Sequence, residues 1–269
     1  MESNTPEFLY KYRPVTNSSN PAEEYSLINL FNNEATFSSR TNFNDLFDSK
    51  INLIKPTPRE IKELARHVDK KSRMRLLSLV DKGSFSPEGL RYLDNAVIKF
   101  NQLIDTYSFI SFSSRDDSNL MWSHYANSHY GFCIEFKGSK IPSKKVTYQK
   151  EIPTLKIIDF FLKTEAGFDK GLSLAEEILL ALCTKLSEWQ YESEYRHISH
   201  DKILTLSSGI PYRNVRYELD WIESIIFGFR MKPHVRQLII DNLPPGVNFK
   251  EAIPDINAMK IRPYKKPCS

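Results

Sequence analysis

Hydrophobic positions alternate with polar ones in several short runs along the chain. Residues 7–14, EFLYKYRP, form an aromatic and aliphatic run that a proline ends, which predicts a short strand. Residues 106–114, TYSFISFSS, and 130–138, YGFCIEFKG, are rich in aromatic and branched side chains and predict two further strands. The same pattern predicts strands in residues 145–152, 189–198 and 221–229, and a strand that becomes a loop in residues 34–48.

A helical spacing of apolar positions dominates residues 57–105. The segment that starts at Thr57, TPREIKELARHV, has a capping threonine, a proline in the first turn and a glutamate three residues later. Residues 86–104 repeat apolar side chains near i, i+3, i+4 and i+7. We also expect helices in residues 17–33, 119–128, 154–187 and 232–243.

Short strands that are interrupted by helices, without a regular alternation of the two, predict an α+β fold. The 269 residues allow one large domain or two small ones. We expect a single domain, residues 1–269, with helical insertions near residues 57–105 and 154–187.

The composition narrows the class of protein. Hydrophobic residues make up 41% and aromatic residues 12% of the chain, which excludes a disordered protein. The net charge of +4 permits a nucleic-acid partner without requiring one. Three scattered cysteines without a CxxC pair indicate a reducing compartment, so we expect a cytoplasmic protein. The first residues are polar, so we expect no signal peptide. The sequence has no long apolar run, so we expect no membrane-spanning helix.

Two carboxylates stand out in the predicted strand of residues 189–198, WQYESEYRHI. Glu192 and Glu194 are two residues apart, so they would point to the same face of a strand. Two negative charges at such a short distance repel each other, which costs free energy unless a ligand or a partner offsets the repulsion. The simpler alternative is a solvent-facing strand edge on which the carboxylates pair with Arg196 or Lys185.

Other candidate residues carry little information individually. Arg13 ends an early predicted strand, and it could equally be a surface salt-bridge partner. Ser111 and Ser113 would share one strand face. Trp122 and Tyr125, three residues apart on a predicted helix, more often belong to a core than to a ligand site.

Several common cofactor sites are absent from the sequence. With nine glycines, the chain has neither a Walker motif nor GxGxxG, which excludes the common ATPase and Rossmann classes. Two histidines, His124 and His129, lie close together, but no HExxH motif accompanies them, and His197 and His200 lie elsewhere. We therefore expect no metal site.

Four motifs together resemble a prokaryotic family of proteins of unknown function. They are LYKYR at residues 9–13, NFND at 42–45, LMWSHYA..H.GFCIEF at 120–136 and W.YE.EYR at 189–196. Leu46 departs from the pattern, since the family commonly has proline after NFND. That family in turn resembles the ADP-ribosyltransferase superfamily, whose members often show an arginine on an early strand, a Ser-x-Ser strand and a Glu-x-Glu strand.

The resemblance implies a split mixed or antiparallel sheet and an NAD-dependent ADP-ribosyltransferase. Cleavage of nicotinamide from NAD creates a ribose oxocarbenium ion, and Glu194 is expected to stabilise its developing charge. Glu192 would remove the proton of the acceptor nucleophile.

The same resemblance assigns the cofactor contacts. Arg13 would pair with the NAD pyrophosphate, because its planar fork of donors suits phosphate oxygens. The two serines would hold the ribose and Glu194, and an aromatic ring beside His124 would stack on nicotinamide. The residues expected at NAD are Arg13, Tyr12, Ser111, Ser113, Trp122 and Tyr125.

In biological terms, the resemblance suggests a toxin or phage-defence effector that acts inside the cell. Its acceptor would be RNA, DNA or a protein side chain, and a neutralising antitoxin protein would accompany it. Two alternatives come from other classes: a nucleic-acid- or protein-binding module without catalysis, and a nuclease that uses the carboxylates with a metal.

Overall fold

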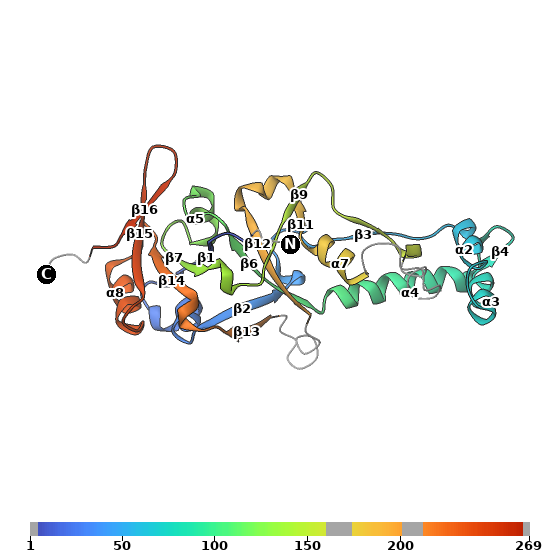
Figure 1. The fold of residues 1–269 in the computed structure, drawn as a ribbon, viewed down its shortest axis with the longest axis horizontal. Helices are drawn as coiled ribbons and strands as arrows, with labels where there is room; N and C mark the ends of the chain where they lie inside the picture. Colours follow the sequence, from blue (N-terminus) through green and yellow to red (C-terminus); the bar gives the residue numbers. More distant parts are fainter. Residues whose placement is uncertain (1–4, 160–173, 201–211, 266–269) are drawn as a thin grey trace. The chain divides into compact units, whose positions relative to one another are not determined.

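The computed structural model describes residues 5–159, 174–200 and 212–265. The chain divides into two compact units, each described by itself below (Figure 1). Unit 1 comprises Met1–Asn42, Ser108–Val146 and Ser187–Ser269, and unit 2 comprises Phe43–Tyr107 and Thr147–Leu186. Both predicted helical insertions fall almost entirely within unit 2.

Unit 1 is built on a mixed sheet with the strand order β13-β2-β6-β1-β7-β14-β15-β16. Neighbouring strands in this order are antiparallel, except β14 and β15, which are parallel. The predicted α+β class is therefore confirmed. The strands are β1 (Phe8–Arg13), β2 (Glu34–Ser39), β6 (Tyr107–Ser113), β7 (Phe132–Lys137), β13 (Tyr212–Arg216), β14 (Ile222–Phe227), β15 (Asn248–Pro254) and β16 (Met259–Pro263).

A further strand branches from this sheet. β12 (Glu194–His200) pairs with β6 and with the short β8 (Lys144–Lys145). β1 pairs with β7 along its whole length but meets β6 at the single register pair of Tyr10 and Ser113. As a result, β6 adjoins both β1 and β12, so the strands of Arg13, of the two serines and of Glu194 are neighbours.

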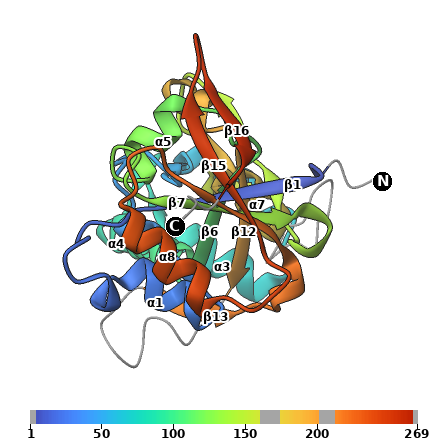
Figure 2. The same cartoon turned by 90° about the vertical axis from the view of Figure 1, so that its left-hand side faces the viewer.

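The two faces of β1 pack against different helices, because successive side chains of a strand point to opposite faces. Leu9 joins a core with residues of α1 (Tyr25–Phe31) and α8 (Pro233–Asn242). Tyr10 and Tyr12 join a second core with Met121 and Trp122 of α5 (Asn119–Tyr125). Figure 2 shows α5 on one side of β1 and β7, and α1 and α8 on the other.

Unit 2 contains helices and short strand pairs. The helices with described bounds in this unit are α2 (Pro58–Leu64), α3 (Lys70–Ser78), α4 (Pro87–Ile104) and α7 (Leu174–Leu182). The strand pairs are β3 (Asn52–Ile54) with β10 (Thr154–Lys156), β9 (Thr147–Gln149) with β11 (Thr184–Leu186), and β4 (Val80–Asp81) with β5 (Ser84–Phe85).

The predicted start of α2 is confirmed, since Thr57 and Glu60 form a reciprocal capping box. The expectation that residues 154–187 are mostly helical is wrong at both ends, where β10 and β11 form. Residues 160–173 of that stretch lie outside the described residues.

The described residues also contain five short 3-10 helices. They are η1 (Pro21–Glu23), η2 (Arg40–Asn42), η3 (Gly138–Lys140), η4 (Ser187–Glu192) and η5 (Leu219–Trp221). Among all helices of the described residues, none is long and apolar enough to cross a membrane.

Candidate functional site

The two glutamates do not lie on one strand. Residues Ser187–Glu192 form the 3-10 helix η4, and β12 begins at Glu194. Between them, Ser193 adopts a left-handed backbone with φ of 47°, which is uncommon for a residue with a side chain. The predicted strand is therefore wrong for its first half, because a tight turn separates the two carboxylates. Both are nevertheless buried, with 4% of Glu192 and 3% of Glu194 exposed.

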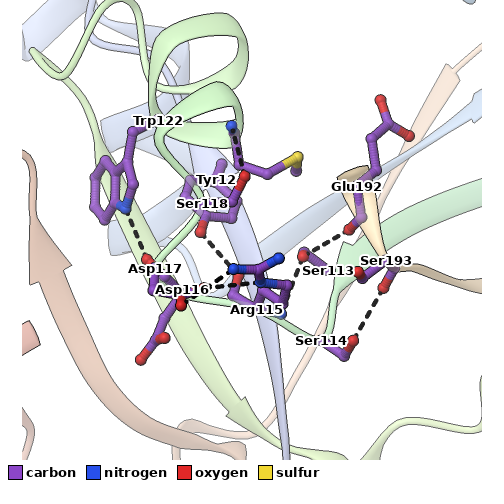
Figure 3. Close-up of polar contacts among 11 residues, drawn as sticks. Tyr12, Ser113, Ser114, Arg115, Asp116, Asp117, Ser118, Trp122, Glu192 and Ser193 are labelled. Atoms are coloured by element: carbon purple, nitrogen blue, oxygen red, sulfur yellow. Dashed lines mark hydrogen bonds and ion pairs between the residues drawn. The ribbon is translucent and has the colours of Figure 1, made fainter. Parts of the chain in front are cut away.

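This turn is hydrogen-bonded directly to the end of β6. The Ser113 hydroxyl donates to the carbonyl of Glu192 at 2.7 Å (Figure 3). The backbone N–H and the hydroxyl of Ser114 both donate to the carbonyl of Ser193, at 3.0 and 3.2 Å. These bonds join positions 79 residues apart in the sequence. The serines were expected to hold Glu194, and the hydrogen bond of Ser113 goes instead to the backbone carbonyl of Glu192.

The Glu192 carboxylate accepts a hydrogen bond from the hydroxyl of Tyr125, at the end of α5. Three further aromatic rings lie near this tyrosine, those of His124, Tyr191 and Trp189. The ring centroids of His124 and Tyr191 are 6.1 Å apart, and those of Tyr191 and Trp189 are 6.0 Å apart. His124 is exposed and the other rings are half-buried. Glu192 therefore lies beside a partly accessible aromatic cluster.

The Glu194 carboxylate forms a buried ion pair. Arg196 donates to it from Nε at 2.6 Å and from Nη2 at 3.1 Å, which is the bidentate geometry of a strong charge-assisted contact. Arg196 is 1% exposed, and its guanidinium lies 5.9 Å from the ring centroid of Phe109. Pairing with Arg196 was one expected alternative, but the pair lies in the interior and not on a solvent-facing edge. The other suggested partner, Lys185, pairs instead with Asp48.

Lys11 is a cation near these carboxylates that the sequence reasoning missed. Its ammonium group donates to the carbonyl of Ser111 at 2.9 Å. The pKa of Lys11 is lowered to about 8, first by burial and then by the charge of Arg13, while Glu194 and Glu192 act in the opposite direction. The available signal was its position in LYKYR, two residues before Arg13 and thus on the same face of the strand.

Arg13 does not join the glutamates. Tyr10 is in register with Ser113 on the α5 side of the sheet, so Arg13, three residues later, points to the opposite face. Its guanidinium lies 6.0 Å from the ring centroid of Tyr25 on α1, and burial lowers its pKa. Arg13 lines a small cavity with Lys11 and Tyr217. Neither the serines nor the glutamates line that cavity, so the cleft that Arg13 was expected to share with them is not found there.

Tyr12 and Trp122 hold the loop that follows β6 through hydrogen bonds to its carbonyl groups. The hydroxyl of Tyr12 donates to the Arg115 carbonyl at 2.8 Å, and Trp122 Nε1 donates to the Asp116 carbonyl at 2.7 Å (Figure 3). Their rings pack edge to face with centroids 5.1 Å apart. Since Trp122 is fully buried, the expectation that it stacks on nicotinamide is wrong. The two residues instead fix the loop that follows Ser113.

A third buried carboxylate, Glu135, lies in the middle of β7. It accepts hydrogen bonds from the Tyr10 hydroxyl at 3.2 Å, from the Lys250 ammonium at 2.6 Å and from the Ser224 hydroxyl. Its exposed fraction is 2%. The sequence signal was a glutamate inside the apolar run GFCIEF, and it was not singled out. In the part of the chain that the structure describes, no group of three or more His, Cys, Asp or Glu side chains could hold a metal ion.

A family model described as a protein of unknown function (DUF2971) matches residues 121–197. The matched range contains Tyr125, Glu135, Glu192 and Glu194, whereas Lys11 and Arg13 lie outside it. No curated protein and no solved structure matches the chain. Similarity to a family of unknown function is therefore found for the segment that supplies most of the site.

Proposed function

We propose that unit 1 is an NAD-dependent ADP-ribosyltransferase. The observation that carries this proposal is the 2.7 Å hydrogen bond from Ser113 to the carbonyl of Glu192. It joins the Ser-x-Ser strand to the Glu-x-Glu turn, two elements whose co-occurrence in the sequence first suggested this chemistry. Both carboxylates of the turn are shielded from bulk water.

Glu194 is proposed to stabilise the ribose cation that forms as nicotinamide leaves. A carboxylate in a water-poor environment interacts more strongly with a developing positive charge than one in bulk water. Arg196 holds the Glu194 carboxylate in place through two hydrogen bonds. In this reaction Arg196 is a positioning residue, since it acts through Glu194.

Glu192 is proposed to remove the proton of the acceptor nucleophile. The Tyr125 hydroxyl orients its carboxylate, and the partly accessible aromatic cluster of His124, Tyr191 and Trp189 lies beside it. Aromatic rings can stack with nucleobases, which supports a nucleic-acid acceptor over a protein one.

Lys11 takes the place that the sequence analysis gave to Arg13. Both side chains lie on one face of β1 and line the same small cavity, but the charges of Glu194 and Glu192 act on Lys11, whereas the carboxylate that acts on Arg13 is Glu24. We therefore propose that Lys11 meets an NAD phosphate. The wider role as an intracellular toxin or phage-defence effector with an antitoxin partner rests on the family resemblance.

Labelled NAD incubated with the protein and a cell extract tests this function. Wild-type protein should release nicotinamide and transfer label to a fraction that nuclease or protease then removes. Glu194→Gln should lower both signals by at least about 100-fold, the scale of a lost electrostatic stabiliser. Glu188→Gln, an exposed glutamate of the same 3-10 helix, is the matched control and should retain activity. If wild-type protein releases no nicotinamide and transfers no label, the proposal is wrong.

One observation favours a different class of function, a binding module without catalysis. The complete ion pair between Glu194 and Arg196 also suits a purely structural carboxylate, as in a binding module without catalysis. Such a module should keep its affinity for nucleic acid in Glu194→Gln and consume no NAD. A nuclease that uses a metal should lose activity with a chelator and be indifferent to NAD.

A further inference from the structure

The net positive charge of the chain comes from one segment of unit 2. Residues 59–82 contain 8 of the 37 basic and 4 of the 33 acidic residues, so the remainder of the chain has 29 of each. This segment comprises α2 from its second residue, α3, β4 and the first residue of the turn after β4. A positive surplus that is concentrated on a few neighbouring elements is the electrostatic signature of a surface that binds a polyanion.

One apolar cluster holds these elements together. Its buried members include Ile61 and Leu64 of α2, Leu76 of α3 and Leu79, and Val80 of β4 packs against them. Because α3 buries only Leu76 among its described side chains, most of the helix faces solvent. The cluster therefore fixes which side chains of α3 a partner can reach.

The accessible side chains of α3 are strongly basic. Its sequence, KKSRMRLLS, has four basic residues and no acidic one. Lys70 and Arg73 are three residues apart and share one face of the helix, and Lys71 lies on the adjoining face. All three are exposed, and their side chains form no ion pair within the residues that the structure describes. Arg75 differs, since its guanidinium lies 5.3 Å from the ring centroid of Tyr92.

Nearby acidic residues do not neutralise these cations. Asp69 caps the backbone of α3, Glu60 belongs to the capping box of α2, and Glu63 pairs with Arg66 at 2.7 Å. A helix that faces only water commonly places acidic residues three or four positions from basic ones. Since α3 has none, its charge is available to an anionic partner.

The turn between β4 and β5 adds a further cation. Lys82 and Gly83 form a two-residue turn with φ of 46° and 87°. Such turns favour Asn-Gly or Asp-Gly, because both residues need a positive φ, which is uncommon for lysine. Lys82 is therefore a poor residue for the turn itself, and it places an exposed side chain with an ammonium group at the tip.

We propose that α3 and the tip of this hairpin bind the phosphate backbone of a nucleic acid. Lys70, Lys71, Arg73 and Lys82 would each meet a phosphate, and such contacts supply most of the affinity for nucleic acid without reading its sequence. Binding needs no NAD, so the proposal stands or falls independently of the transferase reaction.

The character of α3 favours nucleic acid over a membrane surface. Met74 and Leu77 are exposed beside the cations. The amphipathic pattern of the helix is nevertheless weak, whereas helices that lie on a membrane have a strongly apolar face. A duplex, by contrast, carries about one negative charge per 1.7 Å of its axis, a density that suits several cations within one helical turn.

Fluorescence anisotropy of the full chain with labelled DNA and RNA duplexes, without NAD, tests the proposal. A duplex should bind with micromolar affinity, and the affinity should fall by about 100-fold between about 50 and 200 mM salt, the dependence expected for four phosphate contacts. The duplex that binds more tightly identifies DNA or RNA as the source of the phosphates.

Two variants locate the surface. Lys70→Gln, Lys71→Gln and Arg73→Gln together should weaken binding by at least about tenfold and reduce the slope of log affinity against log salt by about 3. Lys82→Asn should reduce that slope by about 1, and it should fold at least as well as wild type because asparagine suits the turn. Circular dichroism establishes that each variant is folded.

The matched control removes three exposed cations of unit 1. Lys144→Gln, Lys145→Gln and Lys260→Gln together change the net charge equally and should leave binding within about twofold of wild type. The proposal is overturned if neither duplex binds at about 50 mM salt, or if the control loses as much affinity as the α3 variant. Tighter binding to poly-glutamate, or to vesicles of phosphatidylserine and phosphatidylcholine, than to both duplexes would also overturn it.

Discussion

Glu194 and Glu135 are two buried carboxylates of unit 1 with similar surroundings and different backbone settings. Each is at most 3% exposed and is paired with a cation at 2.6 Å. Glu135 lies in the middle of β7, which is paired on both sides, by β1 and β14. Glu194 begins β12 immediately after the left-handed Ser193.

The difference separates a structural carboxylate from a candidate catalytic one. Residues in sparsely populated backbone conformations concentrate at functional sites, where the surrounding structure enforces them. The Ser193 turn fits this description, since Ser113 and Ser114 of β6 bind it from outside. Glu135 has no such turn beside it, and its partners come from three further strands. Burial alone therefore does not identify a functional carboxylate.

Glu135→Ala should give the largest effect on stability. The change leaves the Lys250 ammonium and the hydroxyls of Tyr10 and Ser224 without their common acceptor. Removing one member of a buried ion pair costs roughly 3–5 kcal/mol, so the free energy of unfolding should fall by that amount. Urea unfolding measures it. The double variant Glu135→Met with Lys250→Met should recover most of the loss, and a single-variant loss below about 1 kcal/mol would contradict a structural role.

Tyr125→Phe should have a smaller effect, confined to transfer. Loss of its hydrogen bond to Glu192 leaves the proposed base less well oriented, and transfer of ADP-ribose should slow by about tenfold. Release of nicotinamide without an acceptor should change little, because Glu194 is untouched. Tyr130→Phe, an exposed tyrosine of the same segment, is the control. Equal losses in both reactions would argue against a separate role for Glu192.

Lys11 should make the stability of the protein depend on pH. Its pKa is lowered to about 8 in the folded protein from 10.5, so the unfolded chain binds the proton more tightly. The contribution of Lys11 to stability is therefore least favourable below about pH 8 and rises as the pH increases toward 10.5. Urea unfolding of wild-type protein and of Lys11→Met across this range checks it. The same slope in both proteins would show that Lys11 is not perturbed.

Local signals in the sequence were sufficient for several elements. The cap of α2 depends on Thr57 and Glu60, which are three residues apart, and β1 ends where Pro14 follows the strand. By contrast, β15 and β16 were not predicted. β16 is five residues long and exposes most of its length, so its place depends on pairing with β15.

The candidate site was also only partly predictable from the sequence. The types of residue that meet, a serine and a glutamate segment, could be selected from the sequence through the family resemblance. Which side of β1 faces them could not, because that depends on the register of Tyr10 with Ser113. One residue of register decides whether Arg13 or Tyr12 points toward α5. The 3-10 turn before Glu194 was also missed, since alternating aromatic and acidic residues suggested a continuous strand.

The most direct test compares nicotinamide release from NAD by Glu194→Gln and Glu135→Gln, with each rate divided by the fraction of folded protein. Both variants replace a buried carboxylate with a neutral side chain of the same shape beside a cation. If the Glu-x-Glu turn carries the reaction, Glu194→Gln loses at least about 100-fold and Glu135→Gln stays within about twofold of wild type. Equal rates for the two folded variants would contradict the central claim.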